Sequence, residues 1–242
     1  MRWNGFADNS GLIKFEHANT SKKEGYKMNI SDSVAKLNSL LPLKERQDRL
    51  DPALKDLHRS ILRSFVATGK PLSRVQLEEQ LGCEKVDGIL QQLAGDDLLV
   101  LSVDKQEISG AYPFTIEERV HSVNLNGQDM YAMCALDALS IAPMCNVSTR
   151  IMSRCHITKT PIEVQMNGDK VLNAIPADMH VGIRWQGTSG CAAKNLCMEM
   201  VFLKDAATAE AWKREDSEHI SIYSLDDAVE FGAAFFNPLL AA

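Results

Sequence analysis

The stretch PIEVQMNGDKVLN, residues 161–173, predicts a β-hairpin. Its first half carries apolar side chains at every second position from Ile162 to Met166, which is the pattern of a strand with one buried face. Asn167-Gly168 follows, the residue pair that most readily adopts the positive φ angles of a two-residue hairpin turn. We therefore expect an antiparallel sheet in this part of the chain.

The segments on both sides extend this pattern. RVHSVNLNGQDM at 119–130 predicts a strand that ends in a second Asn-Gly turn, and MHVGIRW at 179–185 alternates in the same way. LCMEMVFL at 196–203 predicts a strand with two faces, the first made by Leu196, Met198, Met200 and Phe202 and the second by Cys197, Glu199 and Val201. Helical patterns at 208–216 and 225–236 close the chain. Residues 116–242 therefore predict an α+β domain, a mixed or antiparallel sheet with packed helices.

The first half of the chain is different in character. Residues 1–30 are polar and aperiodic, and we expect a flexible extension there. Residues 31–115 then predict helices at 31–42, 54–68, 73–82 and 83–97, followed by two extended runs about a polar turn. This order is typical of a winged helix, and a winged helix commonly binds DNA. Residues 54–113, however, carry seven Lys and Arg against nine Asp and Glu, which argues against a phosphate-binding surface.

The composition sets broader limits. The chain has 242 residues, 45% hydrophobic and 24% charged, with a formal net charge of −6. The negative charge argues against nucleic acid or an anionic membrane as the main partner, and no apolar run approaches the roughly 20 residues of a membrane span. The N-terminus lacks the pattern of a signal peptide, so we expect a cytoplasmic protein.

One short segment combines two reactive groups. YAMCALDALS, residues 131–140, places Cys134 three residues before Asp137 in an otherwise apolar run. Thiolate sulfur is the ligand that suits a soft metal, and an acid in an apolar setting has the raised pKa of a proton donor. The other cysteines are at positions 83, 145, 155, 191 and 197, and the absence of a C-x-x-C pair argues against a structural zinc site.

The segments YAMCALDAL (131–139), RIMSRCHITKTPIEV (150–164), LCMEMVF (196–202) and ATAEAW (207–212) follow one another in an order and at a spacing that resemble the organomercurial lyase (alkylmercury lyase) family. The resemblance spans about residues 50–240. It implies an enzyme that breaks the carbon–mercury bond, with Cys134, Asp137 and Cys197 as the catalytic groups and as the ligands of mercury. It also implies that Cys155 has a structural role.

The chemistry of such a reaction suits these three residues. One thiolate captures the organomercurial, a second raises the electron density on mercury, and the acid protonates the carbon as the hydrocarbon leaves. We therefore expect Cys134 and Cys197 to lie close enough to share one mercury ion. No separate cofactor is implied, and the released Hg(II) would pass to cellular thiols or to a mercuric reductase.

Some residues differ from the family pattern, and others are possible ligands or pocket residues. Met133 stands where the family commonly has Trp, and Met198, Glu199 and Met200 stand where it often has a further cysteine and histidines. Cys145 and Cys191 have no family counterpart, and we interpret them as packing or auxiliary thiols. We interpret His156 and Trp185 as structural residues, with ligand and pocket roles as the alternatives.

Two functions are therefore open from the sequence. The first is protonolysis of organomercurials, which gives a hydrocarbon and Hg(II). The second is a non-catalytic protein that binds or senses a soft metal on the same fold. Asp137 favours the enzyme, because a protein that only binds mercury gains nothing from an acid beside its thiol.

Overall fold

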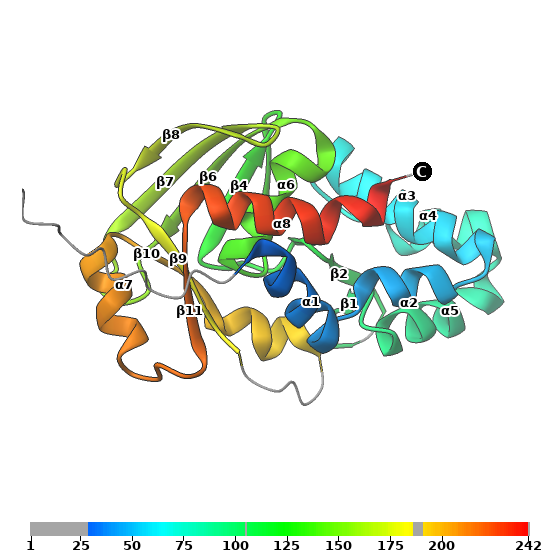
Figure 1. Ribbon diagram of the computed structural model, residues 1–242. Helices are drawn as coiled ribbons and strands as arrows, with labels where there is room; N and C mark the ends of the chain where they lie inside the picture. The colour runs from blue at the N-terminus through cyan, green and yellow to red at the C-terminus, as the bar shows by residue number, and fades with distance from the viewer. Residues whose placement is uncertain (1–28, 105, 186–190, 242) are drawn as a thin grey trace, which may run out of the picture.

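The computed structural model describes residues 29–104, 106–185 and 191–241, and Figure 1 shows helices covering an antiparallel sheet. The helices are α1 (Ile30–Leu40), α2 (Leu43–Arg49), α3 (Pro52–Thr68), α4 (Arg74–Leu81), α5 (Cys83–Gly95), α6 (Ala135–Cys145), α7 (Ala206–Lys213) and α8 (Leu225–Leu240), with 3₁₀ turns η1 (Ala192–Lys194) and η2 (Leu196–Glu199). The strands are β1 (Val100–Leu101), β2 (Ile108–Ala111), β3 (Phe114–Thr115), β4 (His121–Leu125), β5 (Gln128–Ala132), β6 (Ser148–Arg154), β7 (Pro161–Asn167), β8 (Lys170–Ile175), β9 (His180–Arg184), β10 (Met200–Leu203) and β11 (Ile220–Ser224). The α+β class predicted from the sequence is confirmed.

The strands form two antiparallel sheets within the described residues. The larger has the order β1-β2-β3-β5-β4-β6-β7-β8, and the smaller has the order β10-β9-β11. Asn126-Gly127 forms the predicted turn, with φ angles of 50° and 84°, and closes the β4–β5 hairpin. The predicted β7–β8 hairpin is present, but its turn lies one residue later, at Gly168-Asp169: Asn167 pairs with Lys170, and only Gly168 has a positive φ, of 56°. The β7–β8 hairpin, predicted from residues 161–173, lies at one end of the large sheet.

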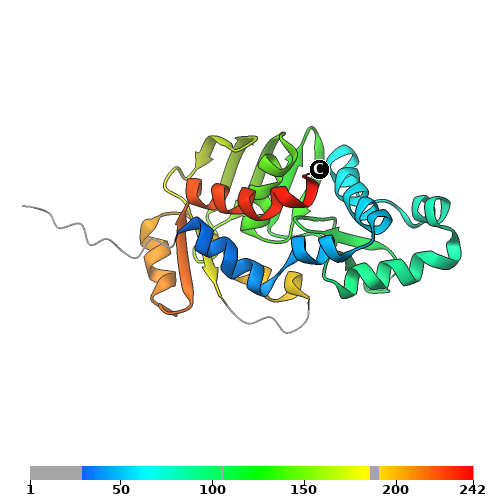
Figure 2. The same cartoon turned by 45° about the vertical axis from the view of Figure 1, so that its right-hand side comes forward.

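Helix α6 lies at the centre of the molecule. It packs against strands β4 to β7 on one side and against α8 on the other, and Figure 2 shows α8 (red) crossing the same face of the sheet. Every residue from Ala135 to Ala142 is buried. A helix that is apolar on all sides is stable only when neighbours cover it completely, which explains why this segment lacks an amphipathic pattern.

The N-terminal region joins the same sheet. Helix α3 ends at Gly69, which has the left-handed conformation, and α4 begins with a capping box formed by Ser73 and Gln76. Strands β1 to β3 extend the large sheet, so the sheet crosses the predicted boundary between residues 115 and 116. The division into two domains and the winged-helix arrangement stay predictions. The predicted flexible extension lies outside the described residues except for Asn29, the N-cap of α1, and Ile30.

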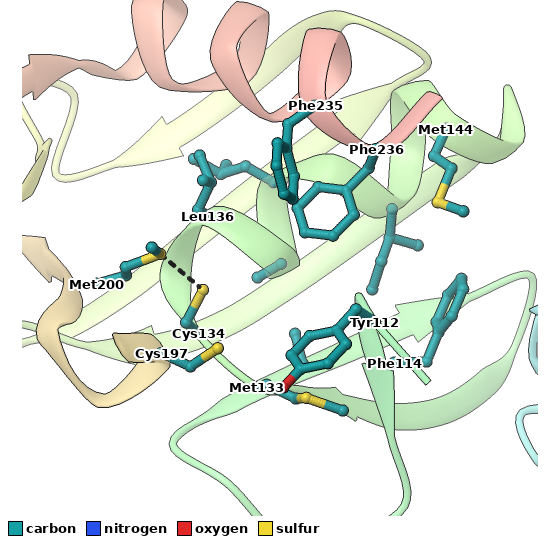
Figure 3. Packing of buried hydrophobic residues seen from close by; sticks show 14 of the residues in the cluster. Tyr112, Phe114, Met133, Cys134, Leu136, Met144, Cys197, Met200, Phe235 and Phe236 are labelled. Carbon is teal, nitrogen blue, oxygen red and sulfur yellow. Dashed lines mark hydrogen bonds between the residues drawn. The ribbon is translucent and has the colours of Figure 1, made fainter. Parts of the chain in front are cut away.

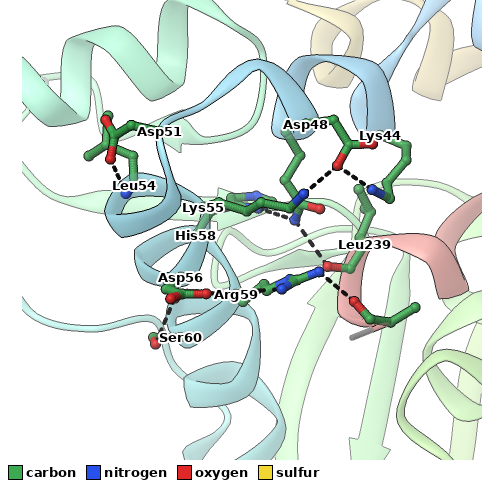
Figure 4. A network of polar contacts seen from close by, with 12 residues as sticks. Lys44, Asp48, Asp51, Leu54, Lys55, Asp56, His58, Arg59, Ser60 and Leu239 are labelled. Carbon is green, nitrogen blue, oxygen red and sulfur yellow. Dashed lines mark hydrogen bonds and ion pairs between the residues drawn. The ribbon is translucent and has the colours of Figure 1, made fainter.

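Polar contacts tie the end of α8 to α2 and α3 (Figure 4). Gln47 Nε2 donates to the Leu239 carbonyl at 3.0 Å and lies 2.9 Å from Nδ1 of His58, whose Nε2 lies 3.2 Å from the Leu98 carbonyl. Burial lowers the pKa of His58 to about 4, so the ring is neutral and donates from Nε2 while Nδ1 accepts. Arg59 donates to the Ala241 carbonyl. These contacts hold α8 in place over α6.

The segment 196–203 differs from its prediction. Only Met200–Leu203 forms a strand, and residues 196–199 form the 3₁₀ turn η2. Pairing with β9 begins only at Met200, opposite Ile183, and the residues before it form turn hydrogen bonds instead, such as the Met198 N–H to the Asn195 carbonyl at 3.0 Å. The predicted common face of Met198 and Met200 is therefore wrong: Met198 is 54% exposed and Met200 is 3% exposed.

Among the described helices, none combines the length and the apolar character that crossing a membrane requires.

The contact between α6 and α8 depends on a glycine. A Cβ atom at Gly232 of α8 would lie 2.2 Å from the Ser140 Oγ of α6, which itself donates to the Leu136 carbonyl at 2.6 Å. We expect Gly232→Ala to lower the free energy of unfolding by about 1–3 kcal/mol in urea titrations, because the helices must separate.

Two further variants control this prediction. Adding Ser140→Ala should restore part of the lost stability, because it removes the clashing oxygen. Gly88→Ala in α5, where a Cβ meets no atom within 4 Å, should be neutral or stabilising by up to about 1 kcal/mol. A Gly232→Ala variant as stable as the parent would contradict the packing described here.

Candidate active site

Cys134 is the N-cap of α6. Strand β5 ends at Ala132, and Cys134 then adopts an extended conformation with φ −150° and ψ 178° before the helix begins. Its Sγ accepts a hydrogen bond from the Asp137 backbone N–H at 3.3 Å. A thiol thus takes the place of the oxygen that usually caps a helix, and the three-residue spacing places Asp137 in the first helical turn beside it.

Cys197 reaches the same point from a different part of the chain. It lies in η2, and the bend at Met200 brings it to the N-terminal end of α6. Ligand atoms of Cys134, Asp137 and Cys197 all lie within 4.8 Å of one another, and all three residues are buried. Figure 3 shows the two thiols side by side, with Met200 beyond them. This is the proximity that the sequence predicts.

The Asp137 carboxyl is in an environment that favours its protonated form. Burial raises the pKa of Asp137 to about 7, although hydrogen bonds from the two thiols and from the Cys134 backbone act in the opposite direction. Its Oδ2 is buried and has no hydrogen-bond partner in the described part of the chain. A carboxyl with a pKa near neutrality is able to accept a proton and to give it back at the same pH.

Both thiols resist ionisation. Burial raises the pKa of Cys134 well above its usual value, and the neighbouring Cys197 and Asp137 raise it further. The hydrogen bond with Cys134 lowers the pKa of Cys197, but burial and the nearby carboxylate outweigh it. The free site therefore holds two thiols, and a soft metal that binds there must displace their protons.

Several neighbours were not anticipated from the sequence. The Sγ of Cys134 lies 3.6 Å from the Sδ of Met200. This contact was not expected, because the strand predicted for residues 196–203 places Met200 on the face opposite Cys197. The Tyr112 hydroxyl accepts from the Ala193 N–H at 2.7 Å and lies 3.7 Å from the Cys191 Sγ, so Cys191 belongs to a polar group next to Cys197. No pattern in the sequence marks Tyr112, because its role depends on a contact across 81 positions.

The other candidate residues from the sequence make packing and hydrogen-bond contacts outside the three-residue cluster. Trp185 is buried, and its Nε1 donates to Ser221 Oγ at 2.8 Å. Cys155 is buried, with its N–H donating to the Thr160 carbonyl at 2.8 Å. His156 packs edge to face against Trp212 at 5.9 Å. Cys145, at the end of α6, is half-buried.

A cavity of about 260 Å³ leads to the site. Its lining includes Met133, Cys197, Met200 and Phe202. Cys197 is the member of the three-residue cluster that borders it, so a small apolar molecule that enters would meet this thiol first.

Known proteins resemble this chain in sequence and in structure. The sequence model of the alkylmercury lyase family matches residues 114–237. An alkylmercury lyase of Staphylococcus epidermidis is 26% identical over 206 residues, 84% of this chain and 90% of that protein, and one of Pseudomonas putida is 27% identical over 185 residues, 75% of this chain and 83% of that protein. The crystal structure of the mercury-bound form of MerB2 superposes with a TM-score of 0.69 at 23% identity, covering 82% of this chain and 98% of that one.

The family match covers more than half of the chain and includes all three clustered residues, Cys134, Asp137 and Cys197. The relatives are matched over most of their own length as well. By sequence, and with a fold that agrees, this chain belongs to the alkylmercury lyase family.

Proposed function

We propose that this protein cleaves the carbon–mercury bond of organomercurials, with Cys134 and Cys197 as the mercury ligands and Asp137 as the group that moves the proton. The observation that carries the proposal is the buried cluster of two thiols and one carboxyl within 4.8 Å. Family membership supports the reaction, and the geometry supports the assignment of roles.

The first step is capture of the substrate. A compound R–Hg–SR′ enters along the cavity and exchanges its thiolate for a cysteine of the site, releasing R′SH with that cysteine's proton. The ionised Asp137 then accepts the proton of the second thiol, and the resulting thiolate binds the same mercury. The pKa of Asp137, about 7, lies below the raised pKa values of both thiols, so bond formation to mercury must drive this transfer.

The second step breaks the carbon–mercury bond. Two thiolates on one mercury increase the electron density on the bound carbon, which makes it a better base. The protonated Asp137 donates to that carbon, R–H leaves, and the carboxylate is restored. Hg(II) remains on two sulfurs. The apolar surroundings keep bulk water from competing as the proton source.

Product release requires other thiols. Two molecules of a cellular thiol, or the paired cysteines of a mercuric reductase, would take Hg(II) by exchange and return both protons to the site. The three side chains supply ligands, base and acid, so the reaction proposed here needs no separate cofactor.

The proposed partners do not include nucleic acid. Helix α5 is the last helix before the extended runs of the predicted winged helix. It carries Glu84 and Asp87 against Lys85, and Asp87 is paired with Arg74 at 2.8 Å. A helix that enters a DNA groove needs cations to displace the counterions of the phosphates.

Replacing the proton donor should separate capture from cleavage. We expect Asp137→Asn still to capture phenylmercury by thiolate exchange at a site cysteine but to release benzene about 10²–10⁴ times more slowly, because a positioned acid contributes about that much. Single-turnover benzene release and the mass of the mercury adduct measure the two properties.

Stability provides the control for this variant. The folded carboxyl of Asp137 has a pKa raised to about 7, so its contribution to stability falls as pH rises from about 4 to 7. At pH 8 the Asn variant should therefore melt no lower than the parent. A folded Asp137→Asn that cleaves at the parental rate would show that Asp137 is not the proton donor.

Removing either thiol should abolish two-point capture. We expect Cys134→Ser and Cys197→Ser each to bind mercury through a single site sulfur and to lose turnover, because one thiolate does not activate the carbon sufficiently. Cys83→Ser, which removes an exposed thiol outside the cluster, is the matched control and should keep full activity. Turnover by either site variant at more than about a tenth of the parental rate would contradict the two-thiolate step.

The reaction should depend on pH through Asp137. Because the ionised carboxyl must accept a thiol proton, kcat/KM should decline as the pH falls below about 7, by about tenfold per unit. Steady-state rates between pH 5 and 9 with phenylmercury and excess 2-mercaptoethanol give the profile. A constant kcat/KM from pH 5 to 8 would show that no group with this pKa takes part.

A further inference from the structure

The cavity that leads to Cys197 changes character from its inner end to its mouth. The inner wall is formed by sulfur and apolar side chains, among them Met133, Met200 and Phe202. The lining also carries four basic side chains, the exposed Arg154, His156 and Lys159 at the mouth and the half-buried Arg119, and no Asp or Glu is among the described residues that line the cavity. The chain as a whole has a net charge of −6, so this concentration of basic groups is not a feature of its average surface.

Two of these cations lack a carboxylate partner. Arg154, at the end of β6, is exposed and makes no ion pair within the described residues. The Lys159 ammonium group donates to the His156 carbonyl at 2.6 Å, and no described carboxylate lies within ion-pair distance of it. An anion that entered the mouth would therefore meet two cations, Arg154 and Lys159, that have no ion-pair partner among the described residues.

Arg119 has spare hydrogen-bonding capacity as well. One of its terminal nitrogens pairs with Glu117 at 2.7 Å, and another lies 3.9 Å from the Met198 Sδ, a weak acceptor. Its Nε is buried and has no acceptor in the described structure. The terminal nitrogen beside Met198 has only this weak acceptor, so it is the part of the Arg119 guanidinium that is suited to a carboxylate in the cavity.

Substrate orientation connects the two ends of the cavity. When mercury is bound to the Cys197 thiol, the rest of the substrate must extend along the apolar wall, and its far end then lies at the basic mouth. Burial lowers the pKa of His156, and the nearby Lys159 acts in the same direction, so the imidazole is mainly neutral near pH 7. The charge of the mouth therefore comes from the two arginines and the lysine.

We propose that the cavity selects organomercurials that carry a carboxylate, with Arg119, Arg154 and Lys159 as the recognition groups. This inference rests on the proposed function, because it assumes that mercury is bound at Cys197. The carboxylate has two possible sources, the organic group that is cleaved and the thiol that carries mercury to the site. Both present the same chemistry to the basic mouth.

The first experiment compares two substrates that differ only in charge. We would measure kcat/KM for 4-carboxyphenylmercury and for phenylmercury, both with neutral 2-mercaptoethanol, following benzoate and benzene. We expect the ratio to favour the carboxylate in the parent, to fall about fivefold or more in Arg154→Gln/Lys159→Gln, and to shrink as salt is added. Arg63→Gln removes an exposed charge of α3 outside the cavity and should leave the ratio unchanged.

The second experiment changes the carrier. Phenylmercury would be supplied as its adduct with 2-mercaptoethanol or with mercaptoacetate, which adds a carboxylate to the thiol only. A preference in the first experiment places the recognised carboxylate on the organic group, and a preference in the second places it on the carrier. If neither comparison favours the anion in the parent, or if the double variant keeps the parental ratio, the inference is wrong.

A separate readout keeps this inference distinct from the catalytic proposal. The rate at which each compound forms a mercury adduct, followed by mass spectrometry, measures recognition without any cleavage. Charge-dependent capture without hydrocarbon release would overturn the proposed function and support the selective cavity. Hydrocarbon release with equal capture of both compounds would support the proposed function and overturn the selective cavity. Melting curves of the Gln variants establish that these replacements of exposed side chains leave the fold intact.

Discussion

The burial of the Asp137 carboxyl beside two thiols is the constraint on which the rest of this structure depends. An ionised carboxylate in an apolar interior is costly, and proteins avoid that cost by holding the group protonated or by pairing it with a cation. No described cation pairs with Asp137, and the result is a pKa of about 7. The same burial keeps Cys134 and Cys197 as thiols until a soft metal displaces their protons. Acid, base and ligands thus derive from one physical cause.

Each layer of the fold contributes to that burial. The large sheet covers one side of α6 and α8 covers the other, with Gly232 allowing the two helices to approach closely. Strand β5 delivers Cys134 to the start of α6, and the 3₁₀ turn at residues 196–199 brings Cys197 next to it. The contacts of Gln47 and Arg59 at the end of α8 hold this cover in position. Helices distant in sequence from the site therefore help to keep its carboxyl away from water.

Local signals in the sequence predicted a large part of this arrangement. The Asn126-Gly127 turn, the Ser73 cap and the glycine end of α3 act over a few residues, so the sequence carries them directly. The pairing of Cys134 with Asp137 was also visible, since a spacing of three brings an N-cap and the first helical turn together.

Features that depend on distant partners could not be predicted. The alternation in LCMEMVFL suits a strand, but pairing with β9 begins only at Met200, and Met200 contacts Cys134 against expectation. Helix α2 was not anticipated, because Leu43–Arg49 is short and only two of its residues, Leu43 and Gln47, are buried. Tyr112 and the basic mouth of the cavity likewise arise from segments far apart in the chain.

The most direct test of the account is the ionisation of Asp137 itself. Carbon NMR of protein labelled at the aspartate carboxyl carbons follows every aspartate through a pH titration, and the Asp137→Asn variant identifies the signal that belongs to the site. The account predicts that this carboxyl titrates at about pH 7 in the metal-free protein. A titration near the usual value of about 4 would mean that water reaches the carboxyl, and would contradict its role in carrying a proton from thiol to carbon.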